Sequence, residues 1–124
     1  MAPTDVIVKL KAPAVNHSDL CPRRGLRNKE VQLPHILGSD GAGIVTQADA
    51  LVSHIREGDA VCFYPAEGCG RCNFCITDRE LLWIRLRILG EHENGTYAEY
   101  VRVPGKNCFP IPAHYSFDEA AACL

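Results

Sequence analysis

Three cysteines lie close together near the middle of the chain, in the stretch EGCGRCNFC. Two residues separate Cys69 from Cys72, and two more separate Cys72 from Cys75. The glycines around them favour a tight loop that turns three thiolates towards one centre, and zinc bonds such thiolates at about 2.3 Å. The spacing therefore predicts a metal site, with buried free thiols or a redox-labile disulfide pair as the alternatives.

A structural zinc site needs four protein ligands, and this cluster supplies three of them. The next cysteine along the chain is Cys108, far beyond the cluster. The fourth position could be filled by Asp78, Glu80, His92, Cys108, a water molecule or a group from another chain. The imidazole of His92 has the most suitable chemistry of the nearby groups, although an ordinary solvent-facing histidine is the simpler interpretation of this residue.

The overall composition limits the classes of function. The chain has 124 residues, of which 47% are hydrophobic and 23% charged, and this suits a single globular domain with its own core. A formal net charge of -2 with scattered Lys and Arg argues against nucleic acid as a partner. No apolar run reaches the length of a membrane span, and Asp5 interrupts any signal-peptide pattern. Seven cysteines, an odd number, suit a reducing compartment, so we expect a cytoplasmic protein.

The elements that must position the cysteines are mostly strands. Residues 6–12 alternate, with apolar side chains on one face, which predicts a half-buried strand. Three further segments are rich in β-branched and aromatic residues and should form strands: 43–47, 61–64 and 96–103. Gly38, Gly41 and Gly43 have the order G-x-x-G-x-G, which differs from that of a phosphate loop, so they indicate bulges or close backbone approaches.

The last part of the chain combines prolines with a helix start. Pro104, Pro110 and Pro112 exclude a long helix and favour an edge strand or an extended connection. Ser116 and Glu119 have the spacing of a capping box that opens a helix. The sequence therefore predicts a mainly β barrel or sandwich with one or two short helices.

Six motifs, taken in order, resemble one family: VNHSDLCPRRG, LPHILGSDGAGIV, EGDAV, CGRCNFC, ILGEHENGTYAEYV and SFDEAAA. They resemble the N-terminal catalytic domain of medium-chain zinc-type alcohol dehydrogenases and quinone reductases, and the match covers nearly the whole chain. The resemblance implies a single GroES-like domain over 1–124, a partly open β-barrel, with a structural-zinc lobe at 66–83. It also implies NAD(P)-dependent oxidation or reduction of alcohols, aldehydes or quinones.

The structural-zinc lobe departs from the family pattern, which is C-x2-C-x2-C-x7-C. Trp83 stands where the fourth cysteine is found in the family. An indole has no lone pair to offer a metal, because its only polar group is a donor N–H. We therefore expect one of three outcomes: zinc is bound weakly, a substitute ligand completes the site, or zinc is absent. Trp83 could then pack as an apolar lid over the lobe.

At the catalytic zinc site, this sequence departs further from the family pattern. Zinc-dependent members carry a Cys where this chain has Asn16, and a His-Glu pair where it has Ser39-Asp40. The combination resembles the branch that reduces its substrate with a nicotinamide cofactor and no catalytic zinc. That resemblance implies a substrate cleft lined by Asn16, Ser18, Asp19 and Ser39. In the alternative interpretation, Asn16 and Asp19 only cap a turn or a short helix.

The family continues into a Rossmann domain, whose Gly-rich turn and helix N-terminus hold NAD(P), and the 124 residues contain no such unit. We therefore expect a domain truncated at both ends and inactive in isolation, since half of the cleft is missing. Exposed apolar surface should favour self-association or binding to a Rossmann domain. Two other classes remain open, a small zinc-binding interaction module and a ring-forming co-chaperonin.

Overall fold

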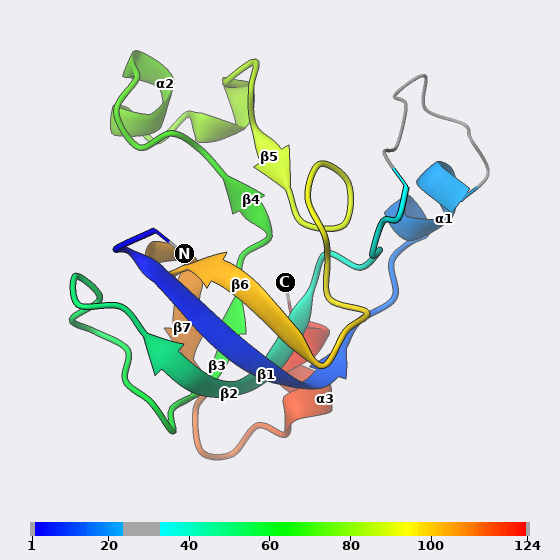
Figure 1. The fold of residues 1–124 in the computed structure, drawn as a ribbon, viewed down its shortest axis with the longest axis vertical. Helices are drawn as coiled ribbons and strands as arrows, with labels where there is room; N and C mark the ends of the chain where they lie inside the picture. The colour runs from blue at the N-terminus through cyan, green and yellow to red at the C-terminus, as the bar shows by residue number, and fades with distance from the viewer. Residues whose placement is uncertain (1, 24–32, 124) are drawn as a thin grey trace.

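A five-stranded sheet dominates the computed structural model, which describes residues 2–23 and 33–123 (Figure 1). Its strands are β1 (Asp5–Pro13), β2 (Gly41–Ala48), β3 (Ala60–Phe63), β6 (Tyr100–Pro104) and β7 (Cys108–Pro110). They lie in the order β6-β1-β2-β3-β7, and each neighbouring pair is antiparallel. The sheet curves without closing, which confirms the mainly β, partly open barrel.

The predicted strands are present with small changes of boundary. Only the second half of the segment 96–103 is a strand, because β6 begins at Tyr100. Both β6 and β7 end on a proline and both are edge strands, as the missing amide donor of proline favours. Between β1 and β2 the register shifts twice, and a β-carbon added to Gly43 would lie 2.2 Å from the Lys9 carbonyl oxygen. The predicted bulges and close backbone approach are therefore confirmed.

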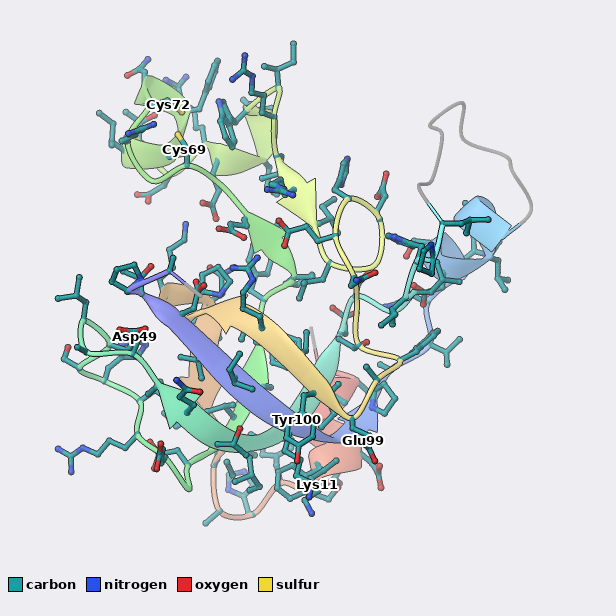
Figure 2. All side chains as sticks on the ribbon, in the orientation of Figure 1. Lys11, Asp49, Cys69, Cys72, Glu99 and Tyr100 are labelled. Atoms are coloured by element: carbon teal, nitrogen blue, oxygen red, sulfur yellow. The ribbon has the colours of Figure 1, made fainter. Side chains whose placement is uncertain are left out.

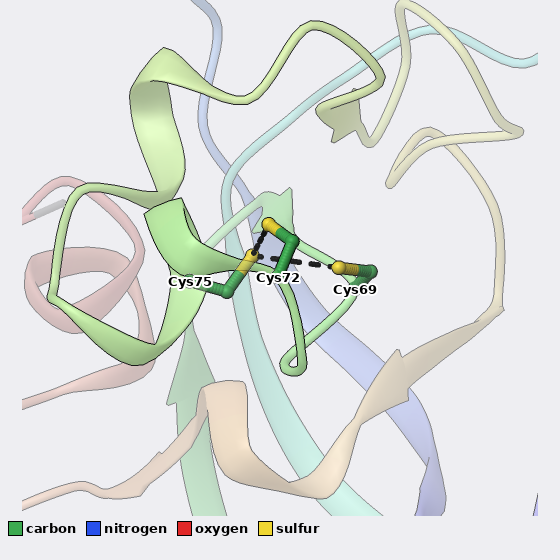
Figure 3. A group of neighbouring side chains, drawn as sticks. All are labelled: Cys69, Cys72 and Cys75. Carbon is green, nitrogen blue, oxygen red and sulfur yellow. Dashed lines mark hydrogen bonds between the residues drawn. The ribbon is translucent and has the colours of Figure 1, made fainter.

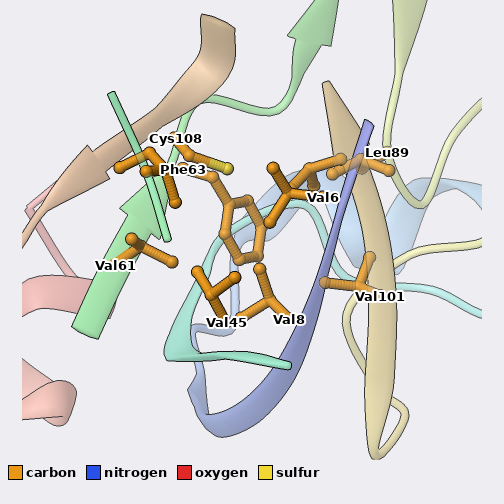
Figure 4. Packing of buried hydrophobic residues seen from close by; sticks show 10 residues of the cluster. Val6, Val8, Val45, Val61, Phe63, Leu89, Val101 and Cys108 are labelled. Carbon is orange, nitrogen blue, oxygen red and sulfur yellow. The ribbon is translucent and has the colours of Figure 1, made fainter. Parts of the chain in front are cut away.

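The core of the barrel is formed by the inward faces of the strands, together with Ile55 and Leu89 from segments between strands (Figure 4). Val6 and Val8 of β1 are fully buried while Lys9 and Lys11 are exposed, as the alternation in the sequence predicts. Their packing partners in the core are Val45, Ile55, Val61, Phe63, Leu89, Val101, Val103 and Cys108. Burying a side chain such as Phe63 contributes about 1.5–3 kcal/mol, so this cluster is the main source of stability for the sheet.

The described residues include three short α-helices, where one or two were expected: α1 (His17–Arg23), α2 (Asn73–Ile76) and α3 (Phe117–Ala121). The predicted capping box is present at α3. The Glu119 backbone N–H donates to Ser116 Oγ at 3.3 Å, and the Ser116 backbone N–H donates to Glu119 Oε2 at 2.8 Å. Ala120 and Ala121 of α3 pack against Ala12 and Ala42 of the sheet. No helix in the described part of the chain is long and apolar enough to cross a membrane.

A separate lobe, residues 66–88, stands at one side of the barrel (Figure 1). It contains a two-stranded sheet of β4 (Ala66–Glu67) and β5 (Arg87–Ile88), with α2 and the 3-10 helix η1 (Glu80–Leu82) between them. A second 3-10 helix, η2 (Gly105–Asn107), joins β6 to β7 in the barrel. Figure 2 shows Cys69 and Cys72 in the lobe, at the opposite end of the molecule from Tyr100.

Arg102 of β6 connects the barrel to the lobe. Its Nη1 lies 3.3 Å from Asp5 Oδ1 of the sheet, and its Nη2 lies 3.6 Å from Glu67 Oε2 of the lobe. The same Nη2 lies 2.5 Å from Glu93 Oε2. One guanidinium therefore ties together three carboxylates from the sheet, the lobe and the loop that follows the lobe.

Candidate metal centre and substrate cleft

The three cysteines of the lobe converge as the spacing predicts (Figure 3). Cys69 follows β4, Cys72 is the residue before α2, and Cys75 lies within that helix. The sulfur atoms are 3.5 Å apart for Cys72 and Cys75 and 3.8 Å apart for Cys69 and Cys75, and all three lie within 4.8 Å of one another. Three thiolates bonded to one tetrahedral zinc at 2.3 Å lie about 3.8 Å apart, so the cluster fits the metal.

Hydrogen bonds favour a thiolate at one end of this cluster. A hydrogen bond from the Arg71 backbone N–H to Cys69 Sγ is the main reason why the pKa of Cys69 is lowered to about 7. Burial raises the pKa of Cys75, and its bond with Cys72 acts in the same direction. Cys69 therefore ionises before Cys75, and a cation that binds there draws the other thiols into the thiolate form.

The fourth ligand is not in place among the described residues. No further His, Cys, Asp or Glu in that part of the chain has a ligand atom within 4.8 Å of all three sulfurs. Cys108 belongs to the barrel core, where burial raises its pKa to about 12. His92 Nδ1 accepts a hydrogen bond from the Ile88 backbone N–H at 3.2 Å. Trp83 is half-buried directly after η1, and its role as a lid over the lobe stays a prediction.

A cavity of about 570 Å³ brings together the four residues expected to line a substrate cleft, namely Asn16, Ser18, Asp19 and Ser39. They come from two places in the chain: α1 with the residue before it, and the approach to β2. The remaining lining residues are His17, Asp40, Tyr64, Pro65, Ile88, Gly90 and Glu91. The cavity therefore lies where the barrel meets the end of the lobe.

Hydrogen bonds hold the polar residues of this cavity in place. Asp19 Oδ2 accepts from the Asn16 backbone N–H at 2.8 Å and from the Tyr97 hydroxyl at 2.9 Å. Asn16 Nδ2 donates to the Asp40 carboxylate, and Ser39 Oγ donates to the Leu89 carbonyl oxygen at 3.0 Å. The Asn16 backbone N–H, just before α1, donates to Asp19 in the first turn of that helix, which is one half of a capping box, so these two residues both cap a helix and line the cavity.

Burial raises the pKa of two of these hydrogen-bonded groups, Asp40 and Tyr97. Burial raises the pKa of Asp40, while the hydrogen bond from Asn16 opposes that rise and the charge of Asp19 adds to it. Burial, reinforced by the hydrogen bond to Asp19, raises the pKa of Tyr97 to about 12. The phenol therefore stays protonated and donates to Asp19 throughout the neutral range.

The sequence does not identify Asp40 as a lining residue of the cavity, or Tyr97 as a hydrogen-bond partner of Asp19. The family pattern could have identified Asp40, because it follows Ser39 at a position where zinc-dependent members carry a carboxylate. No sequence pattern could have identified Tyr97, since 78 positions separate it from Asp19 and only the fold brings them together.

Comparison with known proteins decides the family. The family model of the alcohol dehydrogenase GroES-like domain matches residues 2–113. This chain belongs to that family. An alcohol dehydrogenase from Geobacillus stearothermophilus is 35% identical over 118 residues, which are 94% of this chain and 35% of the relative.

Solved structures agree with this assignment. A crystal structure of an NAD-dependent alcohol dehydrogenase matches 97% of this GroES-like chain with a TM-score of 0.92 and 46% identity, over 35% of its own length. A thermostable alcohol dehydrogenase from Pyrobaculum aerophilum with bound cobalt and zinc matches 98% of the chain with a TM-score of 0.85 and 33% identity, over 36% of its own length. The chain thus spans about a third of the length of these relatives.

Proposed function

We propose that this GroES-like domain provides the substrate side of an NAD(P)-dependent oxidoreductase that acts on alcohols, aldehydes or quinones. The cavity beside α1 carries the proposal. Asn16 and Ser39 stand there at positions where zinc-dependent members have metal ligands, and both present hydrogen-bonding atoms instead. We infer that the substrate oxygen is held by hydrogen bonds, without a catalytic zinc.

The residues of the cavity can each take a part in holding a carbonyl or hydroxyl group. When bound, a reduced nicotinamide would supply a hydride to an aldehyde or quinone, and an oxidised one would accept a hydride from an alcohol. The Ser39 hydroxyl and the Asn16 amide are donors that can turn to a substrate oxygen. Asp19 fixes the backbone of Asn16, and it is itself held by Tyr97. Positioning of this kind is the contribution that the domain makes to catalysis.

Two partners follow from this proposal. A Rossmann domain completes the cleft and holds NAD(P), so we propose that the 124 residues alone do not turn substrate over. Side chains such as Val15 and Ile84, which are 78% and 94% exposed, favour burial against that domain or against a second copy of the chain.

A cluster of free thiols that binds structural zinc also needs a reducing compartment, for which we propose the cytoplasm.

Activity measurements with and without a nucleotide-binding domain test the proposal. The purified chain is mixed with NADH or NADPH and a panel of aldehydes and quinones, alone and with the separately produced nucleotide-binding domain of a relative. We expect turnover only in the mixture. Ser39→Ala should lower kcat/KM about tenfold or more by removing one hydrogen bond to the reacting group, whereas the exposed Ser53→Ala should not change it. Tight NADPH binding and turnover by the chain alone would contradict the proposal.

A second candidate function is a small zinc-binding interaction module, which the exposed side chains of the lobe favour. The apolar ones are Phe74, Ile76, Leu81, Leu82 and Ile84. In such a module, zinc would hold the lobe in shape for a partner, and no cofactor or substrate would be needed. The Cys72→Ser variant separates the two functions, because loss of zinc should abolish partner binding in the module but leave a substrate at the cleft unaffected.

A further inference from the structure

The family pattern places the fourth zinc ligand at position 83, so a side chain on the same side of the preceding turn is a candidate to replace it. Trp83 follows η1, and its backbone N–H donates to the Glu80 carbonyl oxygen at 3.0 Å, which is the i to i+3 bond of a 3-10 turn. Side chains three residues apart in such a turn eclipse one another. Glu80 therefore leaves η1 on the same side as residue 83.

The space above Gly68 is shared by the carboxylate and the cluster. A β-carbon added to Gly68 would lie 2.8 Å from Cys75 Sγ and 2.9 Å from Glu80 Oε2. A sulfur ligand and a carboxylate oxygen thus face one small space, which stays open because residue 68 has no side chain. Cys75 and Glu80 also line the same cavity of about 450 Å³.

We propose that Glu80 is the fourth ligand of a zinc site formed with Cys69, Cys72 and Cys75. Zinc accepts carboxylate oxygen at 2.0–2.2 Å, about the same reach as a histidine nitrogen. Lys106 Nζ lies 3.4 Å from Glu80 Oε2, where it orients the carboxylate and offsets the excess negative charge of three thiolates and one carboxylate around Zn²⁺. This inference rests on the structural-zinc part of the proposed function.

Cobalt substitution in the full reduced chain tests the ligand set directly. Bound Co²⁺ has thiolate charge-transfer bands that report the number of sulfur ligands, and its d–d bands report tetrahedral geometry. We expect one tetrahedral Co²⁺ per chain with three thiolates. Glu80→Gln should weaken Co²⁺ and Zn²⁺ binding at least about tenfold, since even outer-shell partners contribute about 10–100-fold. Asp78→Asn is the matched control, an exposed acid on the same cavity, and should bind as the parent chain does.

A second variant keeps the test decisive if Glu80→Gln perturbs the lobe. Trp83→Cys restores the family pattern, so it should give a four-thiolate spectrum, and adding Glu80→Gln to it should no longer weaken binding. Equal affinity of the parent chain and Glu80→Gln, or an equal loss in Asp78→Asn, would overturn the assignment of Glu80 alone. A parent chain that takes up neither metal would overturn both this assignment and the structural-zinc part of the proposed function, while the cleft would remain to be tested by turnover.

Discussion

The barrel and the lobe are stabilised in opposite ways. In the barrel, side chains such as Val8 and Phe63 are fully buried by strands from distant parts of the chain. In the lobe, neither α2 nor η1 has a buried side chain, and the centre is a group of three thiols. Hydrophobic burial offsets the conformational entropy of the barrel, whereas we propose that metal–ligand bonds do so in the lobe. On this proposal, one small domain combines a self-sufficient part with a metal-dependent part.

The largest change in stability should come from a substitution at the centre of the barrel core. Phe63→Ala removes the largest fully buried side chain and leaves a cavity, so we expect a loss of about 3–5 kcal/mol in the free energy of unfolding. Urea denaturation followed by circular dichroism measures it. Phe74→Ala, in the partly exposed helix of the lobe, is the control and should change stability by about 0.5 kcal/mol or less. Similar losses in the two variants would break the comparison.

The next effect concerns the lobe alone. Gly68→Ala places a methyl group between Cys75 Sγ and Glu80 Oε2, so we expect metal affinity to fall at least about tenfold. Titration with Zn²⁺ against a competing chelator measures this affinity. The urea midpoint of the metal-free barrel serves as the control and should not move. Unchanged affinity in Gly68→Ala would mean that the space above residue 68 is not part of the site.

A smaller effect is expected at the edge of the barrel, where α3 covers the sheet. Ser116→Ala removes the hydroxyl that accepts from the Glu119 backbone N–H, and loss of such a helix cap costs about 1 kcal/mol. Urea denaturation should show this decrease, while zinc affinity should stay the same. A change in zinc affinity would show that the barrel and the lobe are coupled more tightly than their separate packing indicates.

The smallest effect is the titration of Tyr97, which donates a hydrogen bond to Asp19 of the cavity. The pKa of Tyr97 is about 12, above its ordinary value of 10.0, because of burial and its hydrogen bond to Asp19. Since the folded state holds this proton more tightly, the associated stability is intact below pH 10 and is lost as the pH rises towards 12. Ultraviolet absorption of the phenolate, compared with a Tyr97→Phe variant, should show the raised pKa. Asp19→Asn should move the pKa of Tyr97 towards its ordinary value. A Tyr97 pKa at the ordinary value in the parent protein would contradict the hydrogen bond from Tyr97 to Asp19.

Local patterns in the sequence were sufficient for much of the fold. The alternation from Val6 to Ala12 predicts β1 because side chains in a strand point to alternate faces, and Ser116 with Glu119 predicts α3 because a capping box is made within one turn. The three-cysteine cluster could also be predicted, since its members are separated by two residues each and need only a tight loop to meet.

Contacts between distant segments could not be predicted in the same way. The bond from Tyr97 to Asp19 depends on where the loop before β6 passes α1, and no local pattern encodes that. The sequence leaves Glu80 as one of several candidates for the fourth ligand, and only the fold brings it and Cys75 to the space above Gly68. The identity of the residues in a site is thus local information, whereas their proximity is a property of the whole fold.

Hydrogen exchange of the full chain, with zinc bound and after its removal by a chelator, tests the central contrast most directly. We predict that metal removal accelerates amide exchange throughout 69–83, while β1 and β2 keep their protection because the barrel core needs no ligand. Equal protection of the lobe with and without zinc, or loss of protection in β1 and β2 together with the lobe, would contradict the account.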